Sequence, residues 1–210
     1  MVCSLFGSLL AGAAVTTLPL VVRTYDVTGV APRTLERAEA SAAVTLAAAG
    51  IRPIWRPCHA SLCTNRPKPH EIEVRIVKAT ARSEPGVLGS AMVDVVEHAG
   101  TLATIYIDRV DALAARTGID RGELLGRAVA HEIGHLVLGT SEHAPFGLMR
   151  ATWTAEEIHR RIPLDWLFSA QQGREMRRRL GETSATDASL HEGITTAHEE
   201  HEPFRYENGS

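Results

Sequence analysis

Three histidines and Glu132 lie close together in the segment HEIGHLVLGTSEHAPFGLM, which spans 131–149. His131 and His135 are four residues apart, a spacing that places two side chains on the same side of a helix, about one turn apart. Imidazoles at this spacing can reach one Zn²⁺ at about 2.0–2.1 Å. Glu132, rotated about 100° from His131, can stand beside such an ion and accept a proton from water. The pattern predicts a catalytic zinc site; the alternative is a pair of hydrogen-bonded core histidines.

A catalytic zinc site usually has three protein ligands and one open position for water, so the segment must supply a third ligand. Gly139 can adopt the positive φ that reverses the chain after a helix, and a reversal there would bring His143 back to the ion. We therefore expect His143 to be the third ligand. Glu156 and Glu157, on a following helix, and His159 are the alternatives.

The residues around the histidines predict a buried helix. Asp120 with Glu123 three residues later is a typical helix N-cap pattern, and Gly139 is a typical end. One face of this helix carries, at spacings of three and four, Leu124, Ala128, His131, His135 and Leu138. The remaining faces are also largely apolar, so the two histidines need polar partners inside the protein.

The rest of the chain predicts an α+β domain, a mixed sheet with helices packed on it. Segments rich in β-branched or alternating apolar residues predict strands at 18–27, 51–56, 71–79, 88–97 and 101–110. The short connection at 98–100 implies that the last two strands run antiparallel. Helices are expected at 33–49, with Gly50 just past the end, at 111–117 and 120–138, and in one or two pieces after Met149.

The ends of the chain differ in composition from its middle. We expect a leader or signal-like segment at 1–17, because LFGSLLAGAAV has the length of a signal-peptide core, although no basic residue precedes it. The catalytic domain is expected at 18–181 and an acidic, disordered tail at 182–210. Export predicts a secreted or periplasmic protein, with a cytoplasmic one as the alternative. A net charge of -3 gives no reason to expect nucleic acid as a partner, and no segment predicts stable membrane insertion.

Cys58 and Cys63 lie in the polar loop CHASLCTNRPKPH. In an oxidising compartment this pair would form a disulfide that bridges the loop. A zinc knuckle that includes His59 and His70 and a pair of free thiols are the other two interpretations.

The pattern His131-Glu132-x-x-His135, a glycine, a third histidine and then Gly147-Leu148-Met149 resembles the metzincin clan of zinc proteases, and it is most similar to the matrixin branch. The family pattern places the glycine three and the third histidine six residues after the second histidine. Here Gly139 is four and His143 eight residues after it, so this turn contains two extra residues.

The resemblance implies a zincin-like fold with a mostly parallel sheet, an antiparallel edge strand, an active-site helix and a small C-terminal helical subdomain. It also implies that Met149 lies beneath the metal; the other interpretation of Met149 is a flexible filler of the core. The ligand set implied is His131, His135 and His143 around Zn²⁺.

The activity implied is that of a zinc-dependent peptidase that hydrolyses peptide bonds through a zinc-bound water with Glu132 as general base. By similarity, an extended peptide or protein substrate would add a strand along an edge strand, for which 88–96 is the candidate. We expect a monomer. The alternatives are a catalytically silent, zinc-stabilised binding domain on a protease scaffold and a metallohydrolase that acts on a non-peptide amide.

Overall fold

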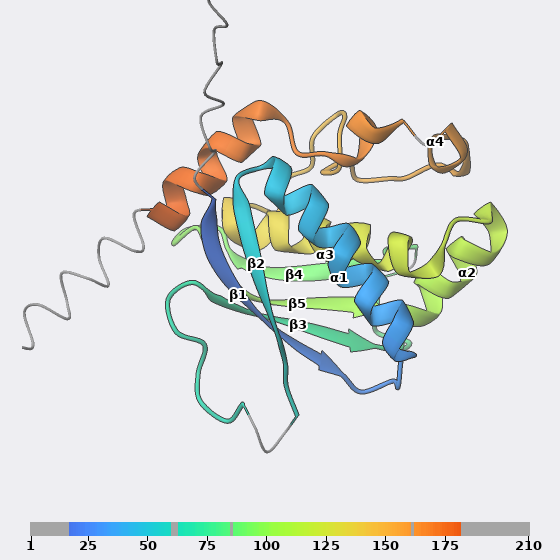
Figure 1. The fold of residues 1–210 in the computed structure, drawn as a ribbon, viewed down its shortest axis with the longest axis horizontal. Helices are drawn as coiled ribbons and strands as arrows, with labels where there is room; N and C mark the ends of the chain where they lie inside the picture. The colour runs from blue at the N-terminus through green and yellow to red at the C-terminus, as the bar shows by residue number, and fades with distance from the viewer. Residues whose placement is uncertain (1–16, 60–62, 85, 161, 182–210) are drawn as a thin grey trace, which may run out of the picture.

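The computed structural model describes residues 17–59, 63–84, 86–160 and 162–181, and these form an α+β fold (Figure 1). Most of the predicted leader and the whole predicted tail lie outside the described residues. The strands are β1 (Leu18–Asp26), β2 (Ile51–Pro57), β3 (Glu71–Val77), β4 (Gly89–Asp94) and β5 (Ala99–Tyr106).

The five strands form one sheet in the order β2-β1-β3-β5-β4. The pairs β1–β2, β1–β3 and β3–β5 are parallel, whereas β4 pairs with β5 antiparallel. This arrangement confirms a mostly parallel sheet with one antiparallel strand at its edge. The predicted edge segment 88–96 forms this strand, so its outer backbone has no neighbouring strand among the described residues.

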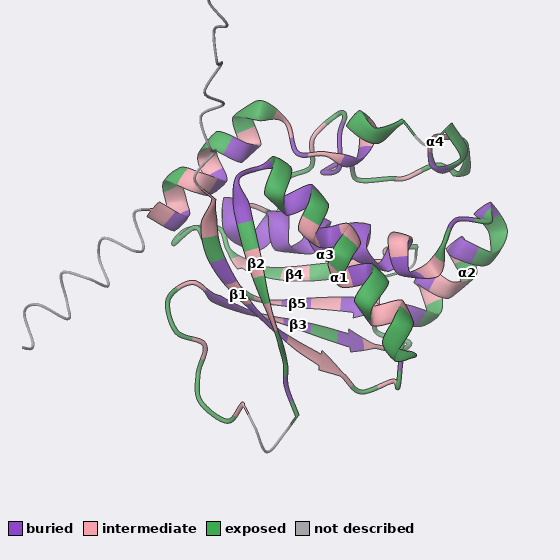
Figure 2. Cartoon of the chain, in the orientation of Figure 1, coloured by how far each residue is buried: buried purple, intermediate pink, exposed green. Residues whose placement is uncertain are grey.

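The helices are α1 (Pro32–Ala48), α2 (Ile107–Thr117), α3 (Arg121–Leu138) and α4 (Ala155–Arg160), followed by the 3-10 turn η1 (Pro163–Trp166) and a helical segment at 170–181. Helices α1 and α3 pack together beside the sheet, and α3 also contacts β4 and β5. Figure 2 shows that α3 is buried almost throughout, whereas α1 alternates between buried and exposed residues. None of the helices that the structure describes is long and apolar enough to cross a membrane.

Two glycines of α3 explain its close contact with α1. A Cβ on Gly126 would lie 2.3 Å from the carbonyl oxygen of Ala38 and 2.6 Å from the Cβ of Ser41. A Cβ on Gly122 would lie 2.6 Å from the Cβ of Arg37. Any side chain at these positions would push the helices apart, so the two glycines determine how deeply α3 sits in the core.

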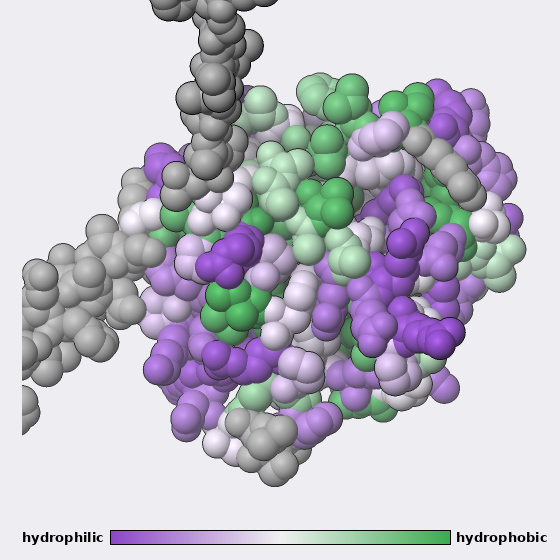
Figure 3. Space-filling model, in the orientation of Figure 1, coloured by the Kyte–Doolittle hydropathy of each residue, from purple (hydrophilic) through white to green (hydrophobic). Residues whose placement is uncertain are grey.

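The exposed face of α1 divides into two halves. Its N-terminal half carries the charged side chains, and its C-terminal half is rich in alanine and includes the exposed Val44. Figure 3 shows the first half as hydrophilic and the second as more hydrophobic. On its inner side, α1 buries Ala38, Ala42, Thr45 and Leu46 in the core.

The loop between β2 and β3 is held on the side of β1 that faces away from the core. Arg23 forms a buried ion pair with Glu71 and donates a hydrogen bond to the carbonyl of Asn65 at 2.7 Å. Cys58 and Cys63 form a disulfide, with their Cα atoms 5.6 Å apart. Of the three interpretations of these cysteines, the disulfide is therefore the one that the structure shows.

The predicted strand at 101–110 is wrong in its second half, because β5 ends at Tyr106 and α2 begins at the next residue. The β-branched residues Ile107 and Val110 favoured a strand, but they belong to a helical pattern of buried residues, Ile107, Val110, Ala114 and Thr117. These side chains pack into the core at spacings of three and four, so burial on a helix outweighs their strand propensity.

Candidate metal centre

The helix that carries the histidines begins and ends as its sequence predicts. The Asp120 carboxylate accepts a hydrogen bond from the backbone N–H of Glu123 at 2.8 Å, which confirms the N-cap. Gly139 has φ 62°, in the left-handed region, and its N–H caps the carbonyl of His135. The chain reverses here, which brings the segment after α3 back across the histidines.

Both helical histidines are held by backbone carbonyls of this returning segment. The Nδ1 of His131 lies 2.9 Å from the carbonyl oxygen of Leu148, and the Nδ1 of His135 lies 2.8 Å from that of Thr140. A carbonyl oxygen only accepts hydrogen bonds, so each Nδ1 must carry the proton and donate it. The remaining nitrogen of each ring, Nε2, then presents a lone pair, as a metal-ligating histidine requires.

The two Nε2 atoms face each other at 3.1 Å. Burial lowers the pKa of His131 to about 4 and also lowers the pKa of His135, so both rings are neutral near pH 7. Two lone pairs would then converge with no proton between them. Two nitrogens at 2.0–2.1 Å from one tetrahedral ion lie about 3.3 Å apart, close to the observed separation. The donor set therefore fits a divalent cation.

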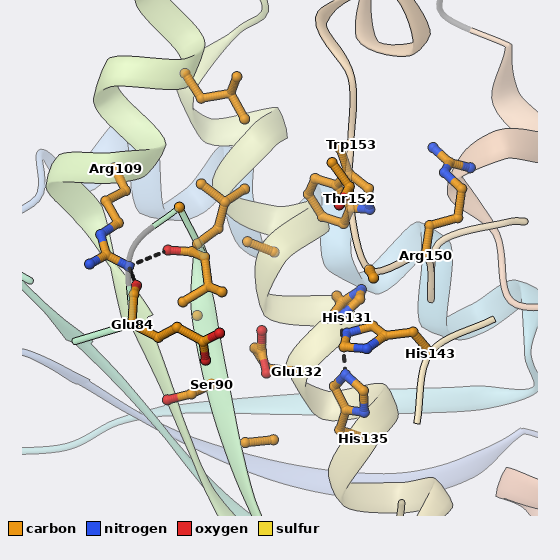
Figure 4. A pocket seen from close by; sticks show the side chains of 18 of the residues that line it. Glu84, Ser90, Arg109, His131, Glu132, His135, His143, Arg150, Thr152 and Trp153 are labelled. Carbon is orange, nitrogen blue, oxygen red and sulfur yellow. Dashed lines mark hydrogen bonds between the residues drawn. The ribbon is translucent and has the colours of Figure 1, made fainter. Parts of the chain in front are cut away.

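His143 completes this group from the loop after α3. One ligand atom from each of His131, His135 and His143 lies within 4.8 Å of the others, and Figure 4 shows the three rings gathered at one side of a pocket. The backbone N–H of Ala144 donates to the carbonyl of Met149 at 2.8 Å, so the loop closes on itself just after His143. Within the described part of the chain, this is the group of residues that could hold a metal ion.

The alternative third ligands lie elsewhere. Glu157 accepts hydrogen bonds from the backbone N–H and the hydroxyl of Thr154, both at 2.9 Å, and pairs with Arg150 at 3.4 Å. It therefore stabilises the start of α4 rather than the histidine group. Neither Glu156 nor His159 belongs to that group.

The turn that contains Met149 supports the histidines from below. Met149 is buried, and its Sδ lies 2.6 Å from the position that a Cβ on Gly134 would occupy. The carbonyl of Leu148, which accepts from His131, also accepts from the indole N–H of Trp153 at 3.2 Å. Met149 thus fills the space beneath the helix turn between the two histidines.

Arg150 holds this turn in place. Its Nη1 donates to the carbonyls of Gly147 at 2.9 Å and Asp165 at 3.0 Å, and its guanidinium lies 5.3 Å from the ring centre of Trp166. Arg150 therefore connects the turn to the 3-10 segment that follows α4. In this way the small helices after Met149 contribute to the position of His131.

Glu132 lies between α3 and the edge strand. Its Oε1 is 2.8 Å, and its Cγ 2.9 Å, from the position that a Cβ on Gly89 would occupy. Burial raises the pKa of Glu132 to about 8. A cation held by the neighbouring imidazoles would favour the ionised form and so oppose this shift. Figure 4 shows Glu132 beside the histidines and outside their ring group.

The histidines and Glu132 open into a cleft of about 540 Å³. One wall is β4 with the loop before it, and another is the face of α2 formed by Arg109, Ala112, Leu113 and Arg116. Ala128 of α3 lies between them, and residues 150–153 form the opposite side. A cleft of this size can bind a short segment of polymer or a small molecule.

Sequence reasoning placed Gly89 in the candidate edge strand 88–96 but did not identify its close approach to Glu132, and it did not identify Arg109 or Trp153 as parts of the site. The contact of Gly89 with Glu132 joins positions far apart in the chain, and a glycine in a strand gives only a weak signal of close approach. Trp153 lies in the segment before α4, and its ring packs edge-on against His131 with centroids 5.6 Å apart.

A comparison of the chain with models of protein families found no match. A search of curated proteins also found no match. The resemblance to metzincins therefore rests on the sequence motif at 131–149 alone.

Proposed function

We propose that this chain is a zinc-dependent peptidase with His131, His135 and His143 as metal ligands and Glu132 as the general base. One observation carries the proposal: two buried, neutral imidazoles donate their Nδ1 protons to the backbone and direct their Nε2 lone pairs toward one point. The third histidine and Glu132 stand beside that point, at the surface of the cleft.

Zinc is the ion that this donor set supports best. Imidazole suits zinc, copper, iron and nickel, and the described residues offer three imidazoles with no thiolate or carboxylate in the ligand group. A site with three histidines and an open fourth position is typical of catalytic zinc, whereas structural zinc normally has four protein ligands. His143 is exposed and all three histidines line the cleft, so a metal ion held by them would be accessible from the cleft.

Zinc, when bound, would lower the pKa of a water molecule to about 7 and polarise the scissile carbonyl. The protein's own contribution comes from Glu132, which accepts the proton of the attacking water and passes it to the departing amine. Gly89 allows this carboxylate to stand close to the edge strand along which a substrate can lie. The carbonyls of Leu148 and Thr140 keep the two buried imidazoles in the tautomer that leaves Nε2 free.

The proposed substrate is an extended peptide. Strand β4 is at the edge of the sheet, and Gly89, Ser90 and Ala91 line the cleft. A peptide can add to such an edge through backbone hydrogen bonds, which would place a peptide bond above the histidines. The Cys58–Cys63 disulfide supports an oxidising compartment, so we propose that the protein is exported.

The alternative, a zinc-stabilised binding domain without turnover, has no use for Glu132. A buried carboxylate with a raised pKa destabilises a fold near neutral pH, and a purely structural site gains nothing from it. The same residue is useful to an enzyme that moves a proton at this point. We therefore favour the peptidase.

The test combines metal analysis with digestion of a peptide library by full-length protein. Wild type and Glu132→Gln should both bind one equivalent of zinc, and wild type alone should release new peptide ends. Glu156→Gln, an exposed acid outside the ligand group, is the matched control and should cleave like wild type. Zinc binding without cleavage by wild type would support the silent binding domain, and absence of zinc binding would refute both.

A further inference from the structure

Glu84 lies at the entrance of the cleft, in the loop that leads into β4. Glu84 is exposed and lines the same cleft as the three histidines. Figure 4 shows its side chain directed toward Ser90 and Glu132. The proposed catalytic mechanism gives this carboxylate no role.

Arg109 of α2 fixes the backbone from which Glu84 projects. Its Nη1 donates to the carbonyls of Glu84 and Val87, the latter at 2.7 Å, and its Nη2 donates to the carbonyl of Ser83 at 3.3 Å. The guanidinium also lies 4.8 Å from the ring centre of Tyr106. One side chain therefore holds three carbonyls of the loop, so the backbone from which the Glu84 side chain projects is fixed before any ligand binds.

The charges around the cleft leave Glu84 as a site for a cation. Glu84 and Glu132 are the only acidic residues among those described that line it, and Glu132 is buried against Gly89. Among the described residues, no arginine, lysine or histidine forms an ion pair with the Glu84 carboxylate. Arg109 is engaged by carbonyls, and Arg150 is directed to the turn and Glu157.

The remaining cation of the cleft is at its other end. Arg116 is seven residues beyond Arg109 on the same face of α2, which corresponds to about 10 Å along the helix axis. The Glu84 end therefore offers a carboxylate beside the carbonyl-bound Arg109, whereas the Arg116 end has no acidic residue among the described residues that line the cleft. A ligand with a positive group at the Glu84 end would gain from this arrangement, whereas one with a negative group there would be repelled.

We propose that Glu84 binds a positively charged group of the substrate, either the side chain of lysine or arginine or a free N-terminal ammonium. The inference rests on the proposed peptidase function and names a substrate class for the same cleft. A partly exposed pair of this kind contributes modestly, so we expect about a three- to tenfold preference for the cationic ligand.

Peptide binding to zinc-loaded protein tests the inference without any need for turnover. Glu132→Gln protein is titrated with matched peptides that carry lysine, norleucine or glutamate at one scanned position, and affinity is followed by fluorescence anisotropy. At one position lysine should bind about three- to tenfold more tightly than norleucine, and glutamate more weakly than both. Acetylated and free N-termini distinguish a side-chain ammonium from a terminal one.

The second variant, Glu84→Gln in the Glu132→Gln background, should abolish the lysine-to-norleucine ratio, and Glu84→Lys should favour glutamate. Glu36→Gln makes the same change of charge on α1, away from the cleft, and should keep the ratio. Equal ratios with and without Glu84, or no preference for a cation at any position, would overturn the inference. Failure of wild type to cleave peptides that show this preference would refute the peptidase and leave the Glu84 site intact.

Discussion

Replacing Gly89 with alanine should separate catalysis from metal binding. The new Cβ would lie 2.8 Å from the Oε1 of Glu132, 2.9 Å from its Cγ and 2.8 Å from the carbonyl oxygen of Thr104. Ordinary contacts of a Cβ begin at 3.4 Å, so each neighbour must retreat by several tenths of an ångström. The Thr104 oxygen belongs to the backbone of β5, which pairs with β4, so it cannot move without the sheet. Either β4 moves outward or the Glu132 side chain rotates away.

Both movements misplace the general base with respect to a substrate on β4. A displacement of about 1 Å in an active site can reduce the rate about 100-fold, and loss of a positioned general base reduces it about 10²- to 10⁴-fold. We therefore expect Gly89→Ala to lower kcat about 10- to 100-fold. The atoms nearest to the new Cβ belong to Glu132 and Thr104 and not to the three histidines. The Kd for zinc should therefore change less than about threefold.

The assay is steady-state cleavage of a fluorogenic peptide, together with zinc titration and thermal unfolding of the loaded protein. Gly181→Ala is the matched control, because a Cβ at this position meets nothing within 4 Å. Undiminished kcat in a folded, zinc-loaded Gly89→Ala variant would refute the placement of Glu132 against the edge strand. A loss of zinc affinity as large as the loss of kcat would refute the separation of the two functions.

Three further predictions concern stability. Gly126→Val should destabilise the protein by about 2–4 kcal/mol in urea unfolding, since its Cβ would lie 2.3 Å from a backbone oxygen of α1. An unchanged midpoint of urea unfolding would contradict the close packing of α1 and α3. The folded pKa of His131, about 4, is below its ordinary value of 6.5, so the contribution of His131 to the stability of metal-free protein should fall by up to about 3 kcal/mol between pH 6.5 and pH 4. Glu132, with its raised pKa, contributes in the opposite direction, so the measured quantity is the difference in pH dependence between wild type and His131→Gln in urea titrations with chelator; identical pH dependence of the two would contradict the burial of His131. The double variant Cys58→Ser, Cys63→Ser should lose about 2 kcal/mol of unfolding free energy in the same assay. It should bind zinc like wild type, because the disulfide loop lies against Tyr25 of β1 and away from the histidines. Weaker zinc binding by this variant would contradict that placement of the loop.

The sequence predicted best those features that depend on neighbours along the chain. The N-cap at Asp120, the left-handed residue at Gly139 and the shared face of His131 and His135 are all consequences of helix geometry. The antiparallel pairing of β4 and β5 followed from a short connection in the same way. His143 joined the other histidines as expected, because the reversal at Gly139 leaves few directions for the loop.

Features that depend on tertiary contacts were not predictable. The start of α2 at Ile107 is decided by burial against the core, and the order of the strands by how α1 and α3 pack beside the sheet. The clamp of Arg109 on the loop before β4 joins a helix to carbonyls more than twenty residues away. Backbone carbonyls carry no signal in a sequence, so neither this clamp nor the partners of the histidine Nδ1 atoms could be identified from residue types.

The most direct test of the metal centre is an anomalous-difference map from crystals grown with zinc, with data collected on both sides of the zinc absorption edge. The account predicts one strong peak at about 2.0–2.1 Å from the Nε2 atoms of His131 and His135 and from one ring nitrogen of His143, with a fourth position open to the cleft. A map with no peak between these rings, or with a fourth protein ligand that closes the site, would contradict it.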